Sequence, residues 1–119
     1  MNTEHQAQKS LLLWWGFACK QWQIQESALF AIPNGGRRDA ITGARLKKEG
    51  VRPGVPDLFL AVPRGKQHGL FIEMKKDGGR VSPEQREYIE MLARHGYSAT
   101  VCVGSSAAIF EVEKYLRQK

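Results

Sequence analysis

The sequence predicts an α/β protein built on a central mixed β-sheet with helices on both faces. Apolar stretches at residues 58–62 and 69–75 are joined by a loop of hairpin length, which predicts two neighbouring antiparallel strands. The second stretch is followed by a helical pattern and then by a strand ending at residue 103. Such a strand–helix–strand passage implies a parallel pair with a right-handed crossover. The predicted order of elements is αβαββαβα.

The first helix is predicted at residues 4–20. Thr3 followed by Gln6 has the spacing of a capping box, and a densely apolar helical pattern continues from there. Glu4 falls on the same side of this helix as Leu11 and Trp15. A carboxylate beside the apolar, core-facing side of a helix needs a hydrogen-bonding or charged partner.

The next elements lead to a rigid loop. Residues 28–32 predict a short buried strand, closed by a turn at 33–36 whose glycines permit positive φ. Residues 39–49 predict a basic helix that ends at Gly50. A segment rich in Pro and Gly, residues 51–56, then leads into Asp57.

Residues 58–62 and 69–75 are the two strands of the hairpin. If its turn lies near Lys66 and Gln67, residues Leu58–Leu60 fall opposite Glu73–Lys75, and Asp57 reaches the same end of the sheet.

The last third of the chain supplies the crossover. Ser82 and Pro83 form a strong helix start, and this helix ends near His95. A strand is predicted at residues 97–103. Ser105 or Ser106 is expected to cap a final helix that reaches residue 116.

Length and composition favour one globular domain over residues 1–119. The chain is 42% hydrophobic and 25% charged, which is an ordinary globular mixture. It has no apolar run near the roughly 20 residues of a membrane span, and no signal peptide is recognised. Cys19 and Cys102 lie in apolar stretches without metal-ligand spacing, as in a reduced protein. We therefore expect a cytoplasmic protein with no membrane partner.

The charge of the chain indicates a polyanionic partner. The formal net charge is +6 and the sequence pI is about 9.6. Clustered Lys and Arg gain affinity by releasing counterions from phosphates, so a nucleic acid is the expected partner.

Charged residues interrupt an otherwise apolar strand at Glu73 and Lys75. Side chains alternate along a strand, so both project to the same face, with Phe71 behind them. Asp57 and Glu73 would then offer two carboxylates at neighbouring strand ends, and the Met74 carbonyl lies between the charged side chains. Oxygen ligands of this kind suit Mg²⁺ or Mn²⁺ better than zinc.

This constellation favours hydrolysis of a phosphodiester. A bound cation polarises a phosphoryl oxygen, and Lys75 beside it can orient the attacking water or stabilise developing charge. The alternative is a cross-strand ion pair that binds no metal.

The wider sequence resembles a known family. Pro56-Asp57 followed by Glu73-Met74-Lys75 resembles the PD-(D/E)xK nuclease signature. Four segments are similar to the virus-type replication-repair nuclease (VRR-NUC) branch, in its stand-alone phage or bacterial form. They are "IPNGGRR", "LKKEGVRPGVPDLFL", "GLFIEMKKDGGRVSPEQ" and "HGYSATV". The resemblance implies a restriction-endonuclease-like αβββαβ core and divalent-metal-dependent DNA cleavage. It also implies homodimers that act on branched DNA such as four-way Holliday junctions or flaps.

The resemblance also implies residue roles. Asp57 and Glu73 would be metal ligands together with the Met74 carbonyl, and Lys75 would be the catalytic lysine. Glu4 would be the remaining acidic residue of the site, with Glu26 as its rival for that role. Gln85 matches a family glutamine that could hydrogen-bond the attacking water or a phosphate, although it could equally close the cap on Ser82.

Basic residues near the ends of the site-bearing elements are expected to contact DNA phosphates without reading sequence. They are Arg37, Arg38, Arg45, Lys47, Lys48, Arg52, Lys76 and Arg80.

Three functions therefore remain open. The preferred one is a metal-dependent, structure-selective DNA endonuclease. The others are a non-catalytic DNA-binding module on a nuclease fold and a sequence-specific restriction endonuclease. The short chain leaves little room for an added base-reading domain, which places the restriction enzyme below the first.

Overall fold

The computed structural model describes residues 3–33 and 40–119. In this part of the chain the sheet has four strands in the order β1–β2–β3–β4. Their bounds are β1 Leu29–Ala31, β2 Leu58–Leu60, β3 Leu70–Lys75 and β4 Ser98–Val103. β2 is antiparallel to both β1 and β3, whereas β3 and β4 are parallel. The predicted mixed sheet is confirmed.

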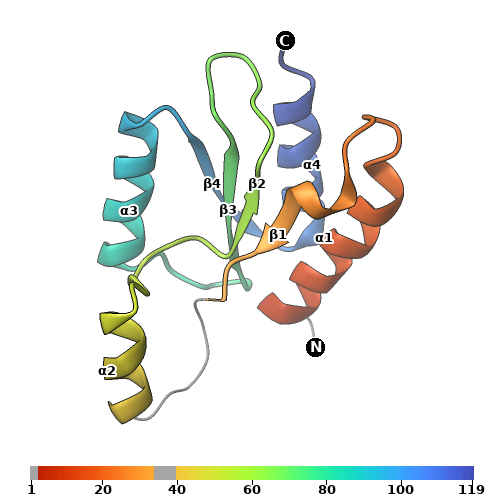
Figure 1. The fold of residues 1–119 in the computed structure, drawn as a ribbon. Coiled ribbons are helices and arrows are strands. Elements are labelled where there is room, and N and C mark those ends of the chain that lie inside the picture. Colours follow the sequence, from red (N-terminus) through yellow and green to blue (C-terminus); the bar gives the residue numbers. More distant parts are fainter. Residues whose placement is uncertain (1–2, 34–39) are drawn as a thin grey trace.

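Helices cover both faces of this sheet, as expected from the order of elements (Figure 1). α1 (Glu4–Ala18) and α4 (Ser105–Leu116) lie on one face, and α3 (Pro83–Arg94) lies on the other. A 3₁₀ turn, η1 (Glu26–Ala28), leads into β1. α2 (Ala40–Lys48) stands away from the sheet, below α3 in the view of Figure 1.

The main apolar core lies between the sheet and the α1–α4 layer. Leu58, Ile72 and Met74 of the sheet are fully buried against it, as are Leu11 and Trp15 of α1. Burial of each such side chain stabilises the fold by about 1.5–3 kcal/mol. Because side chains alternate along β3, burial of Ile72 and Met74 on this face directs Glu73 and Lys75 to the α3 face.

The hairpin register differs from the prediction. β2 pairs with Leu70–Ile72 of β3, so the expectation that Leu58–Leu60 lie opposite Glu73–Lys75 is wrong. The turn closes earlier in the loop, because Arg64 and Gln67 exchange backbone hydrogen bonds of 3.0 and 2.8 Å. The last pair of the observed register is Leu58 with Ile72, so Asp57 and Glu73 each lie one residue beyond it, at the same end of the hairpin.

The start of α4 also differs from the prediction. Gly104 occupies the N-cap position with φ +86°, and no side chain caps this end. The expectation that Ser105 or Ser106 is the cap is therefore wrong. A positive φ is strained for serine but not for glycine, which accounts for the position of Gly104. The other elements begin and end within a residue or two of the predicted bounds.

Across residues 3–33 and 40–119, none of the helices combines the length and apolar character that crossing a membrane requires.

Candidate active site

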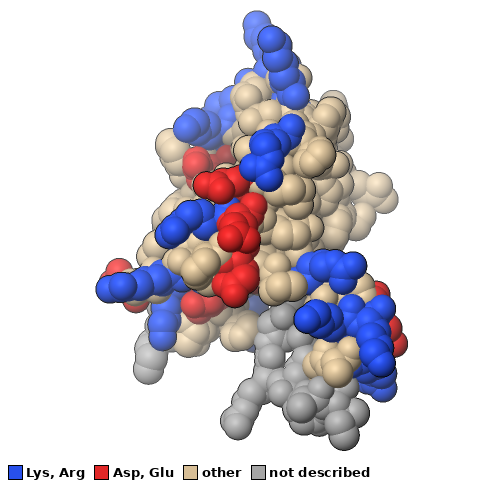
Figure 2. Space-filling view, turned by 90° about the vertical axis from the view of Figure 1, so that its left-hand side faces the viewer, with Lys and Arg blue, Asp and Glu red and all other residues tan. Residues whose placement is uncertain are grey.

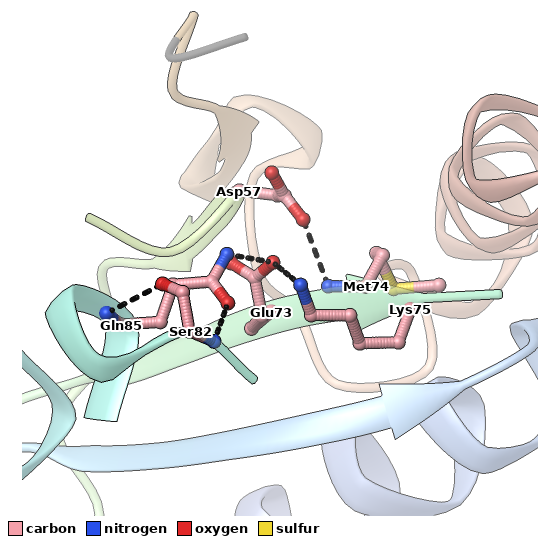
Figure 3. Close-up of polar contacts among 6 residues, drawn as sticks. All are labelled: Asp57, Glu73, Met74, Lys75, Ser82 and Gln85. Carbon is pink, nitrogen blue, oxygen red and sulfur yellow. Dashed lines mark hydrogen bonds and ion pairs between the residues drawn. The ribbon is translucent and has the colours of Figure 1, made fainter. Parts of the chain in front are cut away.

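Asp57 is held at the end of the sheet by a backbone hydrogen bond. Its Oδ2 accepts from the Met74 amide at 2.8 Å, where β3 continues past the end of β2 (Figure 3). In an antiparallel ladder the N–H and C=O of one residue point to the same neighbouring strand. The Met74 carbonyl is therefore directed to the Asp57 side of β3, beyond the last ladder pair, Leu58 with Ile72.

Glu73 and Lys75 lie side by side on the α3 face of β3. Glu73 is only 3% exposed, and its Oε2 lies 3.5 Å from Lys75 Nζ. The Lys75 side chain is itself 12% exposed. Burying an ion pair is costly unless further hydrogen bonds complete it. Here the completing bond comes from α3.

Gln85 supplies that bond and also caps its own helix. Its Nε2 donates to Glu73 Oε2 at 2.9 Å, while its Oε1 accepts from the Ser82 amide at 2.9 Å. Ser82 Oγ in turn accepts from the Gln85 amide at 3.1 Å. The expected cap on Ser82 is therefore present, and it fixes the side chain that contacts Glu73 (Figure 3). A contact of Gln85 with the attacking water or a phosphate stays a prediction.

The carboxylates of Asp57 and Glu73 repel each other electrostatically. Burial, and then the negative charge of Asp57, raise the pKa of Glu73 to about 7, against the opposing effect of Lys75. Burial likewise raises the pKa of Asp57, while the Met74 amide acts to lower it. At neutral pH the pair therefore favours an added positive charge, either a proton or a cation.

Glu4 acts on the same pair from the first turn of α1. Its negative charge contributes to raising the pKa of both Asp57 and Glu73. Glu26, the rival for this role, lies elsewhere: its carboxylate borders Gly16, and its carbonyl accepts from Trp15 Nε1 at 2.8 Å. Gly16 is separated from Glu4 by about 18 Å along the helix axis, at about 1.5 Å per residue. The geometry favours Glu4.

The donor set fits a hard divalent cation. In the described ranges 3–33 and 40–119, no three His, Cys, Asp or Glu side chains already stand together as a metal cage. The groups that would hold a cation are the carboxylates of Asp57 and Glu73 and the Met74 carbonyl. All are oxygen donors, which Mg²⁺ and Mn²⁺ prefer, and a cation would relieve the repulsion between the carboxylates.

The predicted DNA-contacting residues fall in two exposed groups. Arg45, Lys47, Lys48 and Arg52 lie on α2 and the loop after it. Figure 2 shows Lys and Arg side chains gathered over α2, at the lower right of the α3 side of the molecule. Lys76 and Arg80 follow β3, and Lys76 lines a hollow of about 230 Å³ together with Lys75. Arg37 and Arg38 lie outside the described residues.

One positioning residue was not predicted from the sequence. Gly54, in the loop that leads to Asp57, has φ +87°, and a Cβ there would overlap the backbone of Glu84 in the first turn of α3. The loop bearing Asp57 and the helix bearing Gln85 are thus packed together at a glycine. The Pro53-Gly54 pair was a signal for a turn but not for this contact.

Comparison with known proteins supports the resemblance found in the sequence. The family model of the VRR-NUC domain matches residues 2–106. A solved structure described as a "VRR_NUC domain protein" superposes with a TM-score of 0.84 at 31% sequence identity, covering 98% of this chain and 89% of that chain. No match was found among curated proteins. The chain therefore belongs to the VRR-NUC family of nuclease domains.

Proposed function

We propose that this protein is a divalent-metal-dependent DNA endonuclease that hydrolyses phosphodiester bonds in branched DNA. The observation that carries the proposal is the joint position of Asp57, Glu73 and Lys75 at one end of the sheet. Asp57 Oδ2 accepts from the amide of Met74, the residue after Glu73, at 2.8 Å, and Lys75 Nζ lies 3.5 Å from Glu73 Oε2. Two carboxylates and an ammonium so placed would bind a cation and a phosphate side by side.

Each residue of the site has its own role in the proposed reaction. When bound, Mg²⁺ or Mn²⁺ supplies Lewis-acid polarisation of the phosphoryl oxygen and acidifies water. Asp57, Glu73 and the Met74 carbonyl hold that cation, and the charge of Glu4 adds to the attraction. Lys75 orients the attacking water or donates to the oxygen on which negative charge develops. Gln85 keeps the Glu73 carboxylate in place.

DNA is the proposed partner because the chain carries an excess of basic side chains, several of them close in sequence to the site. The chain has 18 Lys and Arg against 12 Asp and Glu. The basic residues of α2, its following loop and the end of β3 would contact phosphates and position the substrate. We place this activity in the cytoplasm of a bacterium or a phage-infected cell.

We also propose that the protein acts as a homodimer. Leu13 and Phe17 lie one turn apart on α1 and are 70% and 72% exposed. Apolar side chains this exposed often mark an interface. Two symmetric sites would suit a four-way junction, which is cut on two strands. Sedimentation as a clean monomer at micromolar concentration would remove this account of junction cleavage.

Cleavage of a substrate panel tests the proposal. Labelled four-way junctions, flaps and linear duplex would be incubated with Mg²⁺, Mn²⁺ or EDTA, using wild type, Asp57→Ala and Lys75→Ala. We expect metal-dependent cutting of the branched substrates and a loss of about 100-fold or more in each variant, as when an electrostatic stabiliser is removed. Undiminished activity in both variants would overturn the site, and equal cutting of linear duplex would overturn structure selectivity. DNA binding without cleavage by the wild type would instead identify a non-catalytic module.

A further inference from the structure

A cavity of about 320 Å³ lies between the end of β1, the loop after α2 and α3. Most of its wall is apolar, with Ile32, Val51, Val55 and Tyr88 among the lining residues, while Arg52 and Glu49 supply charge. This volume is at the lower end of the range of about 300–1,000 Å³ for pockets that hold small ligands.

The walls of this cavity are immediate neighbours of the proposed catalytic residues. The Ile32 amide donates to the Asp57 carbonyl at 2.7 Å. Val55 belongs to the loop that ends at Asp57, which passes the first turn of α3 (Figure 1). Tyr88 lies about one turn beyond Gln85 on α3, so both project from the same side of that helix. The cavity therefore adjoins both the loop that bears Asp57 and the helix that bears Gln85.

We propose that this cavity receives one nucleobase from the nucleotide beside the scissile phosphate; the inference rests on the proposed function and deepens it. The chemistry of the walls fits a flat, mostly apolar ring, because bases stack on aromatic side chains such as that of Tyr88. Moving a base out of the helical stack costs least where the base is already unpaired. The cavity would thereby favour cutting at branches and flaps over continuous duplex.

A chemical double-mutant cycle tests this inference. Flap substrates would carry either a normal nucleotide or an abasic one next to the cut position, and binding would be measured by fluorescence anisotropy in EDTA, where no cleavage occurs. We expect the missing base to weaken wild-type binding about tenfold, in keeping with the stacking of one base. In Tyr88→Leu the two substrates should bind equally, whereas Tyr88→Phe, which keeps the ring, should retain the difference.

Phe110→Leu is the matched control, because Phe110 is an aromatic residue on α4, 60% exposed, on the opposite layer. It should retain the full dependence on the base, and circular dichroism would verify that each variant is folded. Equal binding of both substrates by the wild type, with branched DNA still cleaved, would overturn the base pocket alone. Absence of both binding and cleavage would overturn the proposed function as well. If Tyr88→Leu dissociated a dimer without altering base dependence, the cavity would belong to a protein interface and the inference would fail.

Discussion

At Glu73, the needs of the fold and of the proposed chemistry oppose each other. It is the one charged or polar residue that is fully buried among the described residues. An aliphatic residue there would extend the apolar face at no electrostatic cost. The structure instead surrounds this carboxylate with Asp57, Lys75 and Gln85, as expected if the site is to bind the proposed cation.

The raised pKa of Glu73 makes a prediction about stability. Its folded-state pKa is about 7, against an ordinary value of 4.5, so the folded protein binds more protons than the unfolded chain between these values. In EDTA, the free energy of unfolding should therefore fall as pH rises from about 4.5 to 7, by at most about 3.5 kcal/mol at about 1.4 kcal/mol per pKa unit.

Urea unfolding of wild type and Glu73→Gln across this pH range measures the effect. The variant has no titrating group at this position, so it should lose less stability than wild type on going to pH 7. Parallel curves for the two proteins would show that the Glu73 pKa is not raised. Added Mg²⁺ should reduce the wild-type dependence, because the cation favours the ionised carboxylate.

At the scale of elements, the order of helices and strands could be predicted because each has a local signal. Ser82-Pro83 predicted the start of α3, and the apolar residues around Glu73 predicted β3. The hairpin register could not be predicted, because it depends on which residues of the loop pair, and here the pair is Arg64 with Gln67. Asp57 was predicted to lie near Glu73. Its hydrogen bond to the Met74 amide depends on the register of the hairpin, so it could not be predicted from the sequence.

The packing of Gly54 on α3 gives a prediction for one loop. Gly54→Ala combines a strained φ of +87° with overlap against the Glu84 backbone, and should destabilise the protein by about 2–4 kcal/mol. Gly50→Ala is the matched control, since Gly50 has φ +102° but no atom within 4 Å of an added Cβ. It should cost only about 1–2 kcal/mol.

Urea melts and cleavage rates of both variants would be compared. Gly54→Ala should also lower cleavage more than Gly50→Ala at a temperature where both are folded, because it moves the Asp57 loop away from Gln85. Equal effects of the two substitutions would contradict a positioning role for Gly54.

At the scale of the whole molecule, charge is unevenly distributed. In the view from the α3 side, acidic side chains run along the middle of the face and basic ones gather over α2 (Figure 2). Exposed Glu84, Glu87 and Glu90 recur at three-residue spacing on α3. DNA should therefore approach the site from the side of α2, and not across the outer surface of α3.

The salt dependence of DNA binding tests that approach. Each phosphate contact that is lost should reduce the slope of log K against log salt by about 0.9. Lys47→Gln with Lys48→Gln should reduce this slope by about 1–2 and weaken binding to all sequences alike. The same charge change at Lys114 and Arg117, near the opposite end of the molecule, is the control and should leave the slope unchanged. Equal slopes for all three proteins would exclude α2 from the DNA interface.

The most direct test of the central claim is whether Asp57 and Glu73 share one divalent ion. Mn²⁺ binding can be measured by calorimetry or by electron paramagnetic resonance on wild type, Asp57→Asn and Glu73→Gln. Glu111→Gln is the control, because this carboxylate accepts from Thr100 Oγ1 at 3.3 Å, away from the site. The proposed site predicts that each of the two site variants binds Mn²⁺ with an affinity at least about tenfold lower, and that the control retains the wild-type affinity. Wild-type affinity in either Asp57→Asn or Glu73→Gln would contradict a shared site.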